Sequence, residues 1–171
     1  MLGKININRK NLLLVLACST AMTTLLNPQL NASTLEVGAG KPYATIQAAV
    51  NAAAGGDEIK IYAGTYAETV LVTDKENLYI HANDGDKVVV DGGFNMYNAS
   101  SATWTQNNLI EGLWFDRTGD ASGWAVQHQY GRSNEYLNCV FFGDNSGSNG
   151  IYGYLSYGLN RARNCTFYGL G

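Results

Sequence analysis

The sequence predicts an all-β chain wound as a parallel β-helix, with a short capping helix near the N-terminus. The first observation is a strand-like segment that recurs every 26 residues, at residues 113–115, 139–141 and 165–167. The second is a series of short strand-like segments separated by turn clusters, with no helices between them to connect a conventional parallel sheet. A fixed period of this size is typical of a solenoid, in which each repeat stacks on the one before it.

The first 32 residues have the features of a secretory signal peptide. Basic residues come first, the apolar run from Leu12 to Leu16 follows, and no acidic residue occurs before Glu36. We expect cleavage after Ala32, which makes the protein secreted, extracellular or attached to the cell surface. The alternative is a lipoprotein cut before Cys18. A transmembrane anchor is disfavoured because the apolar core is much shorter than the roughly 20 residues that a spanning helix needs.

We expect residues 33–171 to form one domain with an acidic balance. Residues 1–32 hold three of the 11 Lys and Arg and none of the 14 Asp and Glu, so the mature chain has 8 bases, 14 acids and a net charge of −6. This balance argues against nucleic acid as a partner, since phosphates demand a basic surface. An anionic polysaccharide would need a local basic patch or a bridging cation.

The one convincing helix of the mature chain is expected at about residues 45–54. Its apolar residues share one face at helical spacing, namely Ile46, Ala49, Val50 and Ala53. Thr45 is placed to be the N-cap, and Gly55-Gly56 to end the helix. At the start of a solenoid, such a helix would cover the apolar core and the unpaired edge of the first turn.

Strand-like segments follow at residues 58–63, 69–73, 77–81 and 87–90. Turn-forming clusters separate them, at residues 63–65, 73–75, 83–86 and 91–93. The pattern breaks at about residues 93–107, which we expect to form a loop that projects from one turn. In solenoids, insertions of this kind map to loops, often on the binding face.

Regular 26-residue rungs are expected from about residue 108 to residue 171. Because the side chains of a strand alternate between faces, two columns should point inward: Leu113, Cys139 and Cys165, and Phe115, Phe141 and Phe167. Asn138 and Asn164 should share a bend, where their amides can hydrogen-bond from rung to rung. We expect the two cysteines to be free thiols in the interior. No amphipathic cap follows, so we expect a C-terminally truncated piece of a longer β-helix.

The stretch from Val37 to Gly93 resembles the N-terminal part of right-handed parallel β-helix proteins of the pectate-lyase-like superfamily. The resemblance is carried by residues 38–50, 56–59 and 64–68, and the Asn-Cys-x-Phe segments at 138–141 and 164–167 look like that superfamily's rungs. It implies a right-handed coil and a secreted protein that acts on polysaccharides of the plant or algal cell-wall type. One such scaffold hosts many activities, so the fold alone does not define the function.

Residues 64–68 also match the Gly-x-Tyr-x-Glu signature of the pectin methylesterases in that superfamily. Aligning the esterase pattern along the rungs puts Trp124 where the esterases have a Gln, and Asn149 where they have a catalytic acid. Asn cannot exchange a proton as a general acid must. The resemblance therefore allows a degenerate esterase relative and disfavours an active esterase.

A polysaccharide lyase would cleave uronate polymers by β-elimination. It needs a base, and a cationic residue or Ca²⁺ to stabilise the anion that forms. The basic candidates in the regular rungs are Arg117, Arg132, Arg161 and Arg163, although solvated turn charge also explains them. Asp84, Asp86 and Asp91 match no known calcium loop and suit turns better. The catalytic residues stay unknown, no metal ligands are assigned, and Ca²⁺ enters only as a cofactor of a lyase.

The candidate substrate-binding residues are Trp124, His128, Tyr152 and Tyr154. A spacing of 26 residues aligns His128 with Tyr154 and Trp124 with Gly150. If this face points outward, it presents an aromatic strip suited to stacking on sugar rings, with Gln127 or Gln129 as polar partners. If it points inward, the same residues belong to the core.

The leading hypothesis is therefore a secreted carbohydrate-active β-helix, most like a polysaccharide lyase. The alternative is a non-catalytic carbohydrate-binding or cell-surface solenoid. The sequence leaves both open, together with the oligomeric state.

Overall fold

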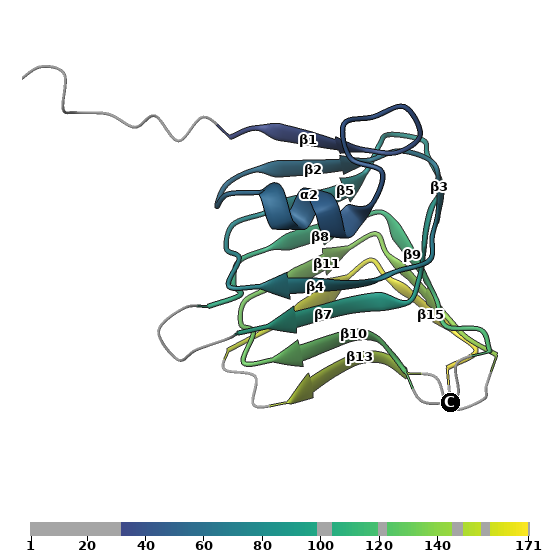
Figure 1. Ribbon diagram of the computed structural model, residues 1–171. Coiled ribbons are helices and arrows are strands. Elements are labelled where there is room, and N and C mark those ends of the chain that lie inside the picture. The colour runs from purple at the N-terminus through teal and green to yellow at the C-terminus, as the bar shows by residue number, and fades with distance from the viewer. Residues whose placement is uncertain (1–31, 99–103, 120–122, 145–148, 155–157, 171) are drawn as a thin grey trace, which may run out of the picture. The chain divides into compact units, whose positions relative to one another are not determined.

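The computed structural model describes residues 32–98, 104–119, 123–144, 149–154 and 158–170. These residues form a parallel β-solenoid of about 5 turns, which confirms the predicted parallel β-helix (Figure 1). The expected signal peptide lies outside the described residues, apart from its last position. None of the described segments is a helix with the length and hydropathy of a membrane span.

Three parallel sheets form the walls of the coil, and every complete turn contributes one strand to each sheet. Sheet A contains β1 (Thr34–Val37), β2 (Glu58–Ile61), β5 (Tyr79–Ala82), β8 (Leu109–Glu111), β11 (Glu135–Leu137) and β14 (Arg161–Arg163). Sheet B contains β3 (Gly64–Tyr66), β6 (Val88–Asp91), β9 (Leu113–Asp116), β12 (Val140–Phe142) and β15 (Thr166–Tyr168). Sheet C contains β4 (Thr69–Thr73), β7 (Gly93–Tyr97), β10 (Trp124–Gln129) and β13 (Asn149–Tyr154).

The predicted capping helix is confirmed as α2 (Ile46–Ala52), and Thr45 is its N-cap. The Thr45 side chain accepts a hydrogen bond from the Ala48 N–H at 3.1 Å. Gln47 covers the edge of β4, because its side-chain amide donates to the Leu71 carbonyl at 3.0 Å and accepts from the Leu71 N–H at 2.6 Å. The helix thus replaces the missing neighbour strand of sheet C and satisfies part of its free edge.

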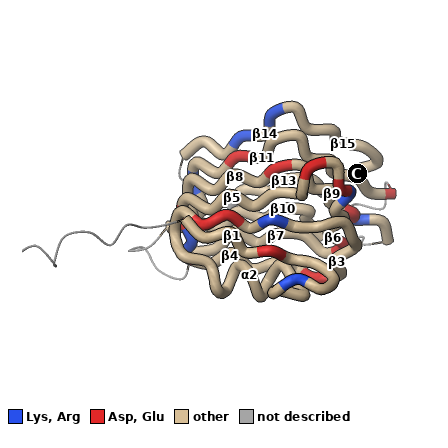
Figure 2. The backbone as a smooth tube through the Cα atoms, turned by 90° about the horizontal axis from the view of Figure 1, so that it is seen from above, with Lys and Arg blue, Asp and Glu red and all other residues tan. Residues whose placement is uncertain are grey.

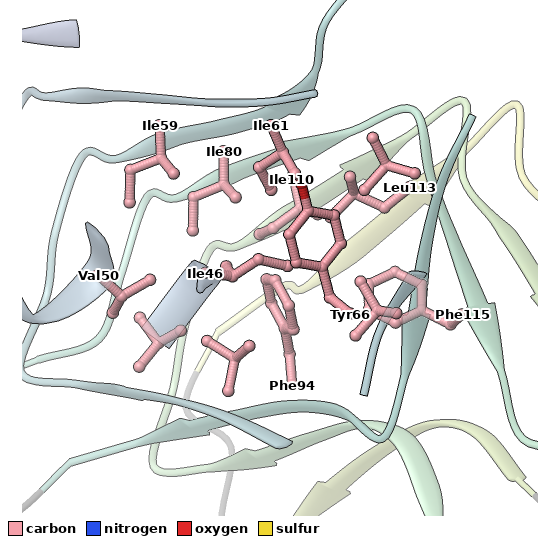
Figure 3. Close-up of a cluster of buried hydrophobic side chains, with 14 of the residues drawn as sticks. Ile46, Val50, Ile59, Ile61, Tyr66, Ile80, Phe94, Ile110, Leu113 and Phe115 are labelled. Carbon is pink, nitrogen blue, oxygen red and sulfur yellow. The ribbon is translucent and has the colours of Figure 1, made fainter. Parts of the chain in front are cut away.

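The interior is filled by columns of side chains that share a register position (Figure 3). In sheet A, one buried column runs through Ile59, Ile80, Ile110 and Tyr136. The predicted aromatic column of sheet B is confirmed, with the Phe141 ring stacked 5.0 Å from Phe115 and 4.8 Å from Phe167. Full burial of one such side chain stabilises the fold by roughly 1.5–3 kcal/mol, so the columns are the main stabilising element of the coil.

The two cysteines among the described residues, Cys139 and Cys165, are free, as predicted. Cys139 is buried in the interior, and Cys165 is half-buried one turn further along. Burial raises the pKa of the Cys139 thiol to about 12. The thiolate is the reactive form of cysteine, so Cys139 acts as a small core residue.

Two asparagine ladders run along the coil. The predicted one, at the bend between sheets A and B, is confirmed by the hydrogen bond from Asn164 Nδ2 to Asn138 Oδ1. A second, buried ladder at the entry to sheet A joins Asn108, Asn134 and Asn160, which recur at a separation of 26 residues. This second ladder was not predicted, although the same spacing marks it in the sequence.

The prediction of a loop at residues 93–107 is wrong for the first part of that range. Residues 93–97 form β7, which pairs with β4 on one side and β10 on the other. Phe94 and Met96 are buried and alternate with half-buried Asn95 and Tyr97, so this stretch has the period of a strand. The rest of the expected loop includes residues 99–103, which lie outside the described residues.

Candidate functional site

The outward-facing side chains of sheet C form rows that run from strand to strand. One row is Leu71, Asn95, Gln127 and Tyr152, which are register partners on β4, β7, β10 and β13. Asn95, Gln127 and Tyr152 are half-buried, whereas their neighbours Phe94 and Val126 are buried in the core. The row therefore places amides beside an aromatic ring on one outer surface of the coil.

Trp124 extends this surface at the start of β10. Its ring stacks on the Tyr152 ring with centroids 4.1 Å apart and an interplanar angle of 18°. The backbone there is tightly packed, since a Cβ on Gly93 would lie 2.5 Å from the Ala125 carbonyl oxygen and 2.8 Å from that of Trp124. Gly93, with φ of +116°, lets β10 approach β7 closely at this point.

A hollow of about 170 Å³ lies next to this aromatic pair. Trp124, Asn95, Gln127 and Arg117 are among its lining residues. The Asn95 side-chain oxygen is shielded from solvent and accepts no hydrogen bond from the described residues. A buried amide oxygen without a partner is costly, so a hydroxyl or water donor in this hollow would be bound favourably.

Arg117 is the positively charged group of this hollow. Arg117 as a whole is almost fully buried, and its Nη1 donates to the Gly92 carbonyl. The residue follows β9, so the turn from sheet B to sheet C brings it beneath the start of β10. A fixed cation beside an aromatic platform favours ligands that carry hydroxyl or carboxylate oxygens.

His128 points into the core, so the structure does not place it on the outer surface of sheet C. Its exposed fraction is 0%, and its Nε2 lies 2.9 Å from the Tyr136 hydroxyl oxygen inside the coil. Burial lowers the pKa of His128 to about 4, which makes the imidazole neutral near neutral pH. His128 therefore belongs to the core, as the inward alternative for this strand predicted. The Trp124 and Tyr152 side chains lie on the outer surface of sheet C.

The expected alignment of β10 with β13 is wrong by one residue. His128 is the register partner of Gly153, and Tyr154 is the partner of Gln129. The turn that enters β13 is one residue shorter than the turn that enters β10, although sheets A and B keep the 26-residue spacing. A slip of one residue exchanges the two faces of a strand, which is why Tyr152 stacks with Trp124. The Tyr154 side chain lies outside the described residues.

The other charged residues considered from the sequence do not line this hollow. Arg132 contacts Gln106 and the Trp104 ring, and Arg163 pairs with Glu135. Asp86 accepts hydrogen bonds from the Ala63 N–H and the Asn83 amide, as a turn-forming residue does. Across the described ranges, no group of three or more His, Cys, Asp or Glu side chains is placed to hold a metal ion.

Figure 2 marks charged residues on β11 and β14 of sheet A. On the outer face of this sheet, side chains of neighbouring turns are bonded to one another: His81 to Glu58, Tyr79 to Glu111 and Arg163 to Glu135. Glu58 accepts from Thr34 and contacts His81, and these hydrogen bonds lower the Glu58 pKa. Burial and the hydrogen bond to Glu111 raise the pKa of Tyr79 to about 12. The hydrogen bonds of these groups hold the turns of sheet A together. Sheet C is therefore the better candidate site.

Asn95 is the site residue that sequence reasoning missed, because it falls in the stretch that we expected to be a loop. The signal was the alternation Phe94-Asn95-Met96-Tyr97, which places Asn95 outward if the stretch is a strand. Comparisons of the chain with protein-family models, with curated proteins and with solved structures found no match. The site and the fold are therefore the basis for any functional assignment.

Proposed function

We propose that this chain is a secreted, polysaccharide-binding parallel β-helix, similar to the pectate-lyase-like superfamily, that binds a glycan across sheet C. The observation that carries the proposal is the stacked pair of Trp124 and Tyr152 beside the hollow lined by Asn95 and Gln127. Aromatic faces bind the apolar C–H faces of sugar rings, while amides bind the hydroxyls at the ring edges. A coil of stacked turns extends such a platform along one direction, which suits a polymer.

The ligand class that the site fits best is an acidic cell-wall polysaccharide such as a uronate polymer. Arg117 supplies a fixed positive charge in a mature chain that is acidic overall. The acidic balance of the whole chain disfavours phosphate-rich polymers, whereas Arg117 offers one positive charge to a carboxylate. The secreted location rests on the basic and apolar pattern of residues 1–32.

The test is retention of the protein in gels that contain polygalacturonate or alginate. Trp124→Ala and Tyr152→Ala should each weaken retention about fivefold, because loss of one stacked ring removes on the order of 1 kcal/mol. Trp104→Ala is the matched control, since Trp104 contacts Arg132 away from the hollow. If the wild type and both site variants are retained equally, sheet C is not the binding face.

A lyase acting at the same face is the second candidate, and the observation that favours it is Arg117 in the hollow. A guanidinium at that position would stabilise the anion formed when a base removes the proton beside a uronate carboxylate. Incubation with uronate polymers, with and without Ca²⁺, should then produce unsaturated chain ends that absorb ultraviolet light. Binding without any such product would leave the non-catalytic function standing and reject the lyase.

A further inference from the structure

The outer face of sheet B carries aromatic side chains in positions where a solvent-exposed sheet face is normally polar. Trp114 lies outward between Leu113 and Phe115, which are both fully buried. Phe142 and Tyr168 are register partners on the next two strands and also face outward. Tyr168 is 73% exposed. The core columns are complete without these rings, so packing of the coil does not account for them.

These rings line a hollow of about 460 Å³ on the side of the coil, together with Lys87, Val140 and Thr166. The Trp114 and Phe142 rings meet edge to face with centroids 6.3 Å apart. The Lys87 ammonium lies 4.3 Å from the centre of the Trp114 ring. The floor of the hollow is therefore aromatic and aliphatic, and polar groups stand at its margin.

The charges around this hollow are mixed. Lys87 is exposed on one side, while Asp91 and Asp116 are register partners in the same outward row as Phe142. One ammonium and two carboxylates give no net positive field, so an anionic polymer or an anionic membrane is not attracted. Carboxylates, an ammonium and the Thr166 hydroxyl are, however, good hydrogen-bonding partners for uncharged hydroxyl groups.

We propose that the outer face of sheet B is a second glycan-binding surface, and that its ligand is a neutral polysaccharide. The sugar rings stack on Trp114, Phe142 and Tyr168, and their hydroxyls bond to Lys87 and to the acidic row. Because the aromatic positions lie on three consecutive turns, the polymer runs parallel to the axis of the coil. The ligand proposed for sheet B differs from the ligand proposed for sheet C. The sheet B proposal does not depend on the function proposed for sheet C.

Retention in gels containing neutral polymers, with hydroxyethyl cellulose, xylan and mannan as probes, tests this surface. Tyr168→Ser and Trp114→Ala should each weaken retention by at least fivefold on the polymer that the wild type binds. Trp124→Ala should leave that retention unchanged while it weakens retention on polygalacturonate. Tyr168→Ser is the decisive variant, since an exposed side chain is replaced and the melting temperature should stay that of the wild type.

Three results would overturn the proposal. The first is that none of the neutral polymers retains the wild type. The second is that Tyr168→Ser and Trp114→Ala are both retained as strongly as the wild type. The third is that the protein binds phosphatidylglycerol vesicles and loses that binding in Trp114→Ala, which would assign the face to a membrane. Failure of the sheet C function would show separately, as unchanged polygalacturonate retention in Trp124→Ala.

Discussion

His128 is a polar residue in a core of hydrocarbon side chains. Its ring lies 5.7 Å from the Tyr136 ring, and its Nε2 contacts the Tyr136 hydroxyl. Its Nδ1 is buried and has no hydrogen-bond partner among the described residues. Protonation would place an uncompensated charge in this interior, which is why burial lowers the His128 pKa from the usual 6.5 to about 4.

The stability of the protein should therefore fall as the pH drops from about 6.5 to about 4. In that window the unfolded chain binds a proton at His128 and the folded chain does not, so protonation favours unfolding. A pKa difference of this size corresponds to roughly 3 kcal/mol of unfolding free energy, lost progressively and then constant below the folded pKa. Urea unfolding across this pH range measures the effect.

His128→Leu combined with Tyr136→Phe removes both polar partners and should flatten this part of the pH profile. His81→Gln is the matched control, because the chain contains only two histidines and His81 lies on sheet A facing Glu58. The account is wrong if the double variant keeps the wild-type pH dependence or if His81→Gln abolishes it. Carboxylates contribute to the slope in all three proteins, and of these Glu58 loses a hydrogen-bond partner only in His81→Gln.

At the scale of elements, the buried asparagine ladder holds successive turns of sheet A together. The Asn134 side-chain oxygen accepts from the Asn108 backbone N–H at 3.1 Å and from its side-chain amide at 2.9 Å. The Asn134 amide donates to the Thr105 carbonyl at 3.1 Å. Each turn thus depends on the next for the satisfaction of buried polar groups.

Asn134→Ala should lower the unfolding free energy by about 2–3 kcal/mol, because it leaves buried donors and an acceptor without partners. Denaturant unfolding measures this loss. Asn138→Gly is the control, since Asn138 is exposed and its φ of +54° suits glycine. We expect the control to change the free energy by less than about 1 kcal/mol, and equal losses in the two variants would show that burial of the ladder is unimportant.

Elements with a clear period could be predicted from the sequence, and elements that depend on turn length could not. The helical spacing of Ile46, Ala49 and Val50 located α2, and the 26-residue repeat located the Phe141 column. The register of β13 was missed because it depends on a turn that is one residue shorter than its counterpart. Turn lengths at the surface are not constrained by the core, so the repeat does not encode them.

Across the whole molecule, the 26-residue repeat specifies the residues that face the interior of the coil. It does not specify the residues that face outward. Inward positions must fill a column shared with the neighbouring turns, which makes them regular in sequence. Outward positions such as Trp114 and Tyr152 meet no such requirement, so filling of the core does not explain their aromatic character. This is why the fold could be predicted while the candidate site emerged only from the observed faces of the strands.

A crystal structure of the protein with an oligogalacturonate would show directly whether a glycan binds across sheet C. We expect a sugar ring stacked on the Trp124–Tyr152 pair, with hydroxyls bonded to Gln127 and to the side-chain oxygen of Asn95, which has no hydrogen-bond partner among the described residues. A sheet C surface left empty at saturating ligand, with or without oligogalacturonate at another face, would contradict it.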